Sequence, residues 1–119
     1  MFQAALKELV DKTDGGIAGL VMDSSGIALD SYAKDGAAFD INTIGIEFSV
    51  VVGSIRRAST MLEAGTAHEI AVGSEKLITV IRTLGEQYFL ALAMLPDGNV
   101  GKGRYNLRLV APQILAELS

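Results

Sequence analysis

A glycine-rich segment near the C-terminus is the first candidate for chemistry in this 119-residue chain. Residues 97–103 read Asp-Gly-Asn-Val-Gly-Lys-Gly and lie between an expected strand and an expected helix, where a phosphate-binding loop belongs. The phosphate-loop pattern requires a glycine where Pro96 stands and a hydroxyl residue where Gly103 stands. The hydroxyl that would bind magnesium is therefore absent. We interpret Gly101 and Gly103 as turn residues that lead into the last helix, and we predict no nucleotide or other cofactor site.

Two neighbouring arginines, Arg56 and Arg57, are the second candidate. An arginine supplied to a partner enzyme can stabilise the charge that develops during phosphoryl transfer. Such an arginine is normally carried on a reaching loop, whereas a pair within a long helix is more typical of solvent or interface charges. His68, the only histidine, is interpreted as a solvated or cross-strand-paired residue and not as a catalytic base.

The remaining polar residues do not combine into a catalytic or metal-binding set. Asp23, Asp30, Asp35 and Asp40 lack the spacing of a calcium loop, and turn and cap roles account for them. The absence of cysteine excludes a thiolate nucleophile and cysteine-ligated zinc or iron–sulfur sites. We therefore expect a protein that is not an enzyme, with no catalytic residue, no metal, no cofactor and no small-molecule substrate.

Composition is typical of one small globular domain spanning residues 1–119. Half of the residues are hydrophobic and only 20% are charged, which is enough to build a core. The net charge of -4 gives no electrostatic reason to bind nucleic acid. The sequence shows no signal peptide and no apolar run of about 20 residues that could insert into a membrane, so we expect a cytoplasmic protein.

Hydrophobic periodicity predicts eight elements in the order α-β-β-α-β-β-β-α. This order indicates an α+β fold in which a five-stranded antiparallel sheet is covered by helices on both faces. Asp40 is the expected N-cap of the longest helix and Gly65 its expected end. The expected helices are 2–12, 41–64 and 102–118, and the expected strands are 17–22, 27–32, 67–73, 77–83 and 88–95. The predicted core stripe of the long helix is Ile41, Ile44, Phe48, Val51, Val52, Ile55, Ala58 and Leu62.

Three segments carry a resemblance to a known family. They are the strand–turn–strand segment Gly16–Leu29 with its Asp-x-x-Gly turn, the long helix that starts near Asp40, and Asn99–Arg104 at the start of the last helix. Together with the element order and the length, they resemble the Roadblock family of dynein-light-chain-like domains and its bacterial and archaeal MglB-like branch. The resemblance implies a profilin-like sandwich, a dimer, and a role beside Ras-like (MglA-type) small GTPases. It also implies that the middle helices pair across the dimer and that the strand after that helix pairs with its own copy.

The outward side of the middle helix is the expected dimer interface. It lies opposite the core stripe, and it has few charges where an ordinary surface helix would carry Lys and Glu. Glycine or serine recurs there at every fourth position, which lets another backbone come close. Two glycines within a helix cost roughly 1 kcal/mol each relative to alanine, and packing across a dimer would compensate. The alternative is a helix buried on both sides within one domain. The expected interface residues of this helix are Gly45, Ile46, Ser49, Val50, Gly53 and Arg57.

The strand after the long helix completes the expected interface with His68, Ile70 and Val72. In the topology of the resembled family this strand lies at the sheet edge, and a bare edge is a template for pairing with another chain. The alternative is an edge that His68 and Glu69 keep from pairing.

Two functions follow from these observations. The first is a non-enzymatic regulator or adaptor of a Ras-like small GTPase, in which a homodimer forms the binding platform. The residues expected to contact that partner are Arg56, Arg57, Thr60 and Met61. The second is a profilin-like structural scaffold or sensory module without GTPase contact.

Overall fold

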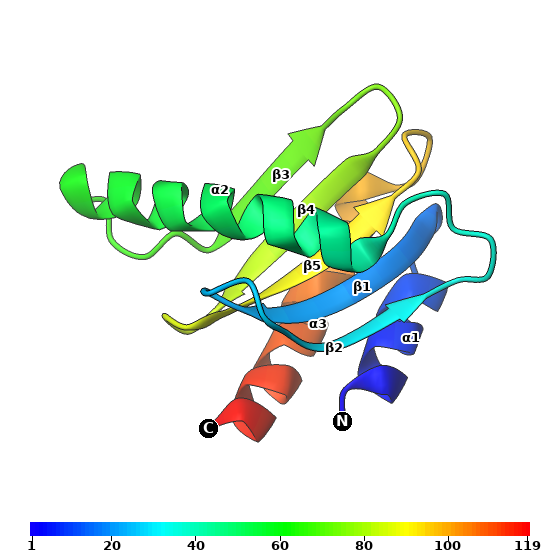
Figure 1. Cartoon of the computed structure of the whole chain (residues 1–119), viewed down its shortest axis with the longest axis horizontal. Coiled ribbons are helices and arrows are strands. Elements are labelled where there is room, and N and C mark those ends of the chain that lie inside the picture. The colour runs from blue at the N-terminus through cyan, green and yellow to red at the C-terminus, as the bar shows by residue number, and fades with distance from the viewer.

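A computed structural model describes all residues from 1 to 119 and confirms the predicted order of elements. The chain forms three helices and five strands in the order α-β-β-α-β-β-β-α, and Figure 1 shows their arrangement. The helices are α1 (Gln3–Asp11), α2 (Ile41–Met61) and α3 (Val100–Leu118), and the strands are β1 (Gly16–Asp23), β2 (Ala28–Ala33), β3 (Glu69–Gly73), β4 (Ile78–Leu84) and β5 (Tyr88–Met94). None of the helices combines the length and the apolar character that a membrane span needs.

The five strands form one antiparallel sheet in the order β2-β1-β5-β4-β3. β1 and β2 are a hairpin, and β3, β4 and β5 are a meander, as the turn residues between the apolar runs predicted. The central strands β1 and β5 are buried almost throughout, because helices cover both of their faces. The edge strands β2 and β3 contain no buried residue, so the core lies under the middle of the sheet.

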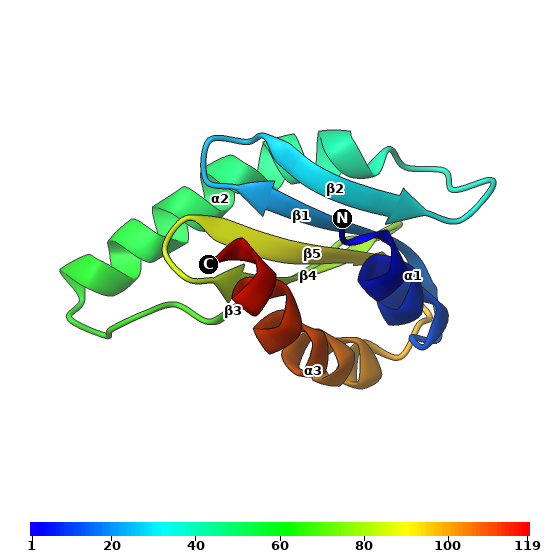
Figure 2. The same cartoon turned by 90° about the horizontal axis from the view of Figure 1, so that it is seen from below.

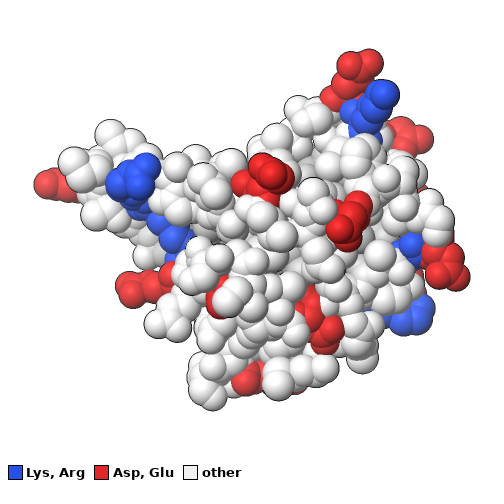
Figure 3. Space-filling view, viewed as in Figure 1, with Lys and Arg blue, Asp and Glu red and all other residues white.

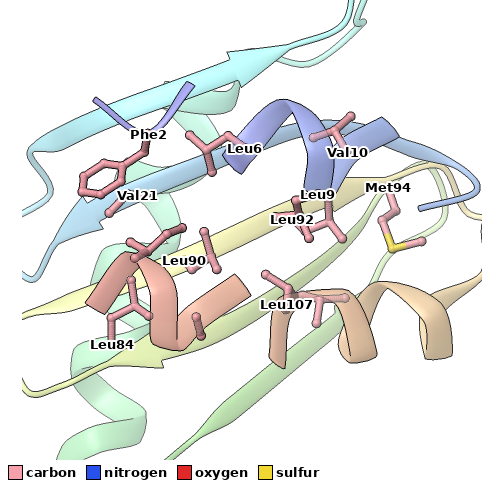
Figure 4. Close-up of a cluster of buried hydrophobic side chains, with 13 residues drawn as sticks. Phe2, Leu6, Leu9, Val10, Val21, Leu84, Leu90, Leu92, Met94 and Leu107 are labelled. Atoms are coloured by element: carbon pink, nitrogen blue, oxygen red, sulfur yellow. The ribbon is translucent and has the colours of Figure 1, made fainter. Parts of the chain in front are cut away.

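Helices cover the two faces of the sheet unequally. Figure 2 shows α2 alone on one face and both α1 and α3 on the other. The face under α1 and α3 holds a cluster of 13 buried hydrophobic residues, most of which Figure 4 labels. The face under α2 holds a cluster of 10, including residues of β1, β4 and β5. Burial of such side chains is the main favourable term in folding, so the α1 and α3 face supplies more of it.

The two ends of α2 are closed in different ways, by a side chain at the N-terminus and by the backbone at the C-terminus. Asp40 caps its N-terminus as predicted, since the Asp40 carboxylate accepts hydrogen bonds from Asn42 N at 3.3 Å and Thr43 Oγ1 at 2.9 Å. The prediction that Gly65 ends the helix is wrong, because the helix already ends at Met61. Glu63 takes the left-handed conformation (φ 55°) that closes the last turn, a position where glycine is more usual.

The N-terminal segment is tied to β2 through one carboxylate. Asp30 accepts hydrogen bonds from the Met1 ammonium at 3.1 Å, Phe2 N at 2.7 Å and Gln3 Nε2 at 2.8 Å. Burial of the carboxyl opposes its ionisation, but the hydrogen bonds from Gln3, from Phe2 N–H and from the N-terminus outweigh burial and lower the pKa of Asp30 to about 2. The ionised form is therefore the one that holds α1 against the sheet.

This contact predicts a loss of stability in acid. Above about pH 4 the carboxyl is ionised in both the folded and the unfolded chain, and only the folded chain gains its hydrogen bonds. As the pH falls from about 4 to about 2, the unfolded carboxyl takes up its proton first, so the free energy of unfolding decreases. Urea titrations at a series of pH values measure this decrease. In Asp30→Asn the free energy of unfolding should decrease less over this pH range than in the wild type. In Asp35→Asn, a change in an exposed turn, it should decrease as in the wild type, and equal decreases in both variants would contradict the role of Asp30.

Candidate protein-binding surface

The C-terminal half of α2 extends past the sheet that supports its N-terminal half. Figure 1 shows α2 running over β1 and then projecting beyond the other strands. The buried residues of the helix are Ile41, Ile44, Gly45 and Val52, and none follows Val52. Beyond that point the chain itself provides little for the helix to pack against, although the segment still carries large apolar side chains.

Two apolar stripes of α2 are exposed as a result. At 100° per residue, Ile46, Val50 and Met61 share one stripe with Gly53 and Arg57; this outer stripe points away from the sheet. Val50 is 72% exposed and Met61 77%. A side stripe of Val51, Ile55, Ala58 and Leu62 is also exposed, with Leu62 at 77%. The space-filling view shows mainly uncharged surface along α2, interrupted by isolated charges (Figure 3). Large exposed apolar patches are typical of protein-binding surfaces.

The predicted core stripe is thus correct only in its first part. Ile41, Ile44 and Val52 are buried and Phe48 is half-buried, but the four residues of the side stripe are exposed. Periodicity identifies which residues share a face of a helix, and it does not say how far the sheet beneath extends.

The predicted outward row of small residues is wrong at Gly45. A Cβ at Gly45 would lie 2.2 Å from Leu20 Cδ2 and 2.7 Å from Met22 Cε, so this glycine faces β1. Ser49 is half-buried beside Gly26 of the β1–β2 turn, and only Gly53 faces open space. The reason is geometric, since residues four apart advance 400° and the row turns by 40° at each step.

The edge of β3 is open, as expected. Thr83 N donates to His68 O at 3.0 Å, and Ser74 N donates to Leu77 O at 2.8 Å. In an antiparallel pair, residues that bond to the neighbouring strand alternate with residues whose backbone groups point away from it, and these two bonds show which residues of β3 are of each kind. In this register Glu69, Ala71 and Gly73 direct their backbone N–H and C=O groups away from β4. The side chains of Ile70 and Val72 point to the α2 face and are half-exposed, and His68 is exposed just before the strand.

The opposite edge, at β2, is blocked by side chains at its centre. Lys34 N donates to Ile17 O, so in this register Ser31 and Ala33 direct their backbone groups outward. The N–H of Ser31 donates to Asp30 Oδ1 at 2.9 Å. The carbonyl of Ser31 accepts a hydrogen bond from Gln3 Nε2 of α1. Side chains that occupy backbone groups in this way oppose strand pairing. Of the two sheet edges, β3 is therefore the more open to another chain.

The four residues expected to contact a partner, Arg56, Arg57, Thr60 and Met61, lie in the projecting half of α2. Some of them are already bonded within the chain and others are not. Arg56 donates from its two terminal nitrogens to Gly85 O at 2.9 Å and to Tyr88 O at 2.8 Å, and its Nε is buried without a partner. Burial lowers the pKa of this guanidinium, with Glu86 acting in the opposite direction. Thr60 Oγ1 donates to Arg56 O at 3.1 Å. Arg57 and Met61 are exposed, so Arg57 is the free cation of the pair.

Sequence reasoning missed one ion pair beside the open edge. Arg104 of α3 donates to Glu69 Oε2 of β3 from Nε at 3.0 Å and from a terminal nitrogen at 2.6 Å. The two residues are 35 positions apart, and no local pattern links them. The contact requires knowing that α3 lies on the face of the sheet opposite α2.

The molecule offers only small hollows for ligands. No group of three or more His, Asp or Glu side chains is arranged to hold a metal ion. A hollow of about 150 Å³ lies between α1 and α3, and one of about 270 Å³ lies beside the β4–β5 turn. Both volumes are smaller than the usual range of ligand pockets. The projecting helix and the open strand are the more prominent surface features.

A sandwich with this order of elements, one helix on one face and two on the other, is the class of fold seen in profilin-like and Roadblock domains. Profilin II from Acanthamoeba castellanii shares the fold at 8% identity, with 100% of each chain covered and a TM-score of 0.66. No family profile and no curated protein matches the sequence.

Solved structures establish the family. MglC from Myxococcus xanthus is 41% identical, with 98% of each chain covered and a TM-score of 0.72. A Roadblock/LC7 domain from Streptomyces avermitilis is 13% identical over 98% of this chain and 96% of that chain, with a TM-score of 0.85. The gliding protein MglB from Thermus thermophilus is 18% identical over 98% of this chain and 88% of that chain, with a TM-score of 0.83. The chain belongs to the Roadblock/LC7 family, which includes MglB and MglC.

The two hydrogen bonds of Arg56 predict a structural role for this arginine. Arg56→Met keeps most of the side-chain length but leaves two carbonyl oxygens without their charged donor. We expect the free energy of unfolding to fall by about 1–2 kcal/mol. Arg108→Met is the matched control, because Arg108 is an exposed helical arginine without a hydrogen bond; its effect should stay within about 0.5 kcal/mol. Urea denaturation followed by circular dichroism measures both, and equal losses would contradict the role of Arg56.

Proposed function

We propose that this chain, as one domain spanning residues 1–119, forms a homodimer through β3 and α2 and acts as a non-enzymatic regulator of a Ras-like (MglA-type) GTPase. The observation that carries the proposal is the uncovered apolar half of α2 next to an open sheet edge. The molecule works in the cytoplasm, where GTP is available.

The dimer follows from what each uncovered feature needs. Glu69, Ala71 and Gly73 offer unpaired backbone groups, and an antiparallel second copy of β3 supplies matching donors and acceptors about a two-fold axis. Gly53 faces open space and allows close approach of a second helix. The partner's α2 then covers the part of the outer stripe around Gly53, and the end of the helix from Arg57 to Met61 stays at the margin of the dimer. The proposed interface comprises Ile46, Ser49, Val50, Gly53 and Arg57 of α2 with His68, Ile70 and Val72 at the edge; Gly45 is excluded because it faces β1.

The GTPase partner is supported by the relatives and by the remaining surface. The 41% identity is to MglC, and the fold is shared with a gliding protein, MglB. Arg57, Thr60 and Met61 lie on the projecting part of α2 and remain available at its end, whereas the guanidinium of Arg56 is held by the β4–β5 turn. The apolar area supplies affinity and Arg57 supplies orientation. Preference for one nucleotide state would shift the state of the GTPase by linkage.

The dimer predicts a specific effect of one glycine substitution. Gly53→Glu places a carboxylate where the folded monomer has open space, so the monomer should fold normally. In the dimer this long side chain occupies the space through which the second helix approaches, and Arg57, one turn later, only partly offsets the loss of water around the carboxylate; the dissociation constant should rise at least tenfold. Light scattering on a sizing column measures the mass, and circular dichroism checks the fold.

Gly101→Glu is the matched control for this experiment. Gly101 is an exposed helical glycine of α3, on the other face of the sheet, and a Cβ there meets only Asn99 Oδ1 at 3.6 Å. The control should remain dimeric. A dimer that persists in Gly53→Glu, or a wild-type monomer, would refute the proposed interface.

A second prediction concerns the GTPase itself. The dimer is mixed with a Ras-like GTPase from the same genome, loaded with GDP or with a non-hydrolysable GTP analogue, and calorimetry measures the affinity. We expect one nucleotide state to bind at least tenfold more tightly. Arg57→Glu, first checked by light scattering to remain dimeric, should weaken binding more than Lys34→Glu, a change in an exposed loop. Absence of a complex in both states favours the scaffold or sensory module, and GTP turnover by the chain alone would identify an enzyme.

A further inference from the structure

Three arginines gather around Glu69 on the face of the sheet opposite α2. Arg82 lies directly across from Glu69 in the β3–β4 register, and Arg104 donates two hydrogen bonds to Glu69 Oε2. Arg108 follows one turn later on α3. All three lower the pKa of Glu69, chiefly through the hydrogen bond from Arg104. The arginine cluster, Arg82, Arg104 and Arg108, is therefore a local group of cations close to one edge of the sheet.

The positive charge of the arginine cluster is not balanced where it lies. One carboxylate, Glu69, stands among three guanidinium groups, in a chain with 14 acidic and 10 basic side chains. The lysines of α1 are paired within their own helix, Lys7 with Asp11 and Lys12 with Glu8. The side chain of Arg104 is 47% exposed even while it is bonded, and Arg108 is exposed. The cluster therefore has donors left for an anionic partner.

The strand beside the cluster is bare on this face. α3 packs on β4 and β5, whereas Ala71 and Gly73 of β3 are exposed. A Cβ at Gly73 would meet no atom within 4 Å. Alternate residues of a strand share one face of the sheet, so Glu69, Ala71 and Gly73 all lie on this face. Beyond Glu69 the surface of β3 therefore consists of the small residues Ala71 and Gly73, which we call the floor.

Pairing of β3 with its copy, as in the proposed function on which this inference rests, doubles these features. Opposite residues of an antiparallel pair project to the same face, so Ala71 and Gly73 of both copies form one floor. An α3 helix with its arginines then flanks the floor on either side. The result is a groove between two arginine clusters, on the face of the dimer opposite the paired α2 helices.

We propose that this groove binds an extended acidic segment of a partner protein. Guanidinium groups match carboxylates in two-pronged geometry, and a floor without bulky side chains admits a peptide backbone. Nucleic acid fits less well, since the floor of Ala71 and Gly73 offers no aromatic ring on which bases could stack, and the ring of Tyr105 lies under Lys102 Nζ, 5.2 Å from the ring centroid. The segment docks without competing for α2, so acidic partner and GTPase bind the same dimer together.

The test uses the full-length dimer and a fluorescein-labelled peptide of twelve glutamates, with binding followed by anisotropy. We expect saturable binding that weakens as salt rises. Arg104→Gln/Arg108→Gln should reduce the affinity at least tenfold while the dimer mass is unchanged. The control Lys7→Gln/Lys34→Gln removes the same charge elsewhere and should change affinity less than twofold. Equal losses in both variants would overturn the groove in favour of general charge attraction.

Three further outcomes separate this inference from the proposed dimer. If the wild type is monomeric by light scattering, the proposed dimer itself fails. If the wild type is dimeric but the Gly53→Glu monomer binds the peptide equally well, the groove is not shared between copies and this inference fails alone. Tighter binding of single-stranded DNA or of phosphatidylserine vesicles than of the peptide would assign the cluster to those anions and overturn the acidic-segment proposal.

Discussion

The mismatch between the length of α2 and the extent of sheet beneath it is the constraint on which the proposed interfaces depend. A helix of 21 residues is about 32 Å long. It leaves the sheet at the end where the β1–β2 and β4–β5 turns lie, since Ser49 lies beside Gly26 and Arg56 binds the carbonyls of Gly85 and Tyr88. The first half of α2 finds β1 and β2 beneath it, and the second half projects past the sheet with its apolar side chains uncovered. The proposed dimer and the proposed GTPase contact both use what this mismatch leaves exposed.

The two edges of the sheet show how one chain can favour a closed assembly. The β2 edge is blocked at its centre by Asp30 and Gln3, which occupy the outward backbone groups of Ser31. The β3 edge has no such protection at Ala71 and Gly73. A sheet with two open edges would add copies without limit, whereas one open edge used about a two-fold axis stops at two.

The sequence predicted the fold well because fold information is local. Apolar runs separated by glycine-containing turns located all five strands, and Asp40 was recognisable as a cap from its type and place. What escaped prediction depends on distant parts of the chain. Gly45 was assigned to the outer side because its contact with Leu20 is invisible to periodicity, and the partners of Arg56 are carbonyls of a turn about 30 positions away. The Glu69–Arg104 pair joins an edge strand to the last helix, and no pattern of residue spacing in the sequence predicts it.

The contacts of α2 at Gly45 and Arg56 have a mechanical consequence. Close seating of Gly45 on β1 sets one point of the helix, and the fork of Arg56 on the β4–β5 turn sets a second, about 16 Å further along the axis. Two fixed points determine the direction of a rod. The tip around Met61 is therefore pre-organised by a single subunit, so the proposed assembly would forfeit little orientational freedom at the surface proposed for recognition.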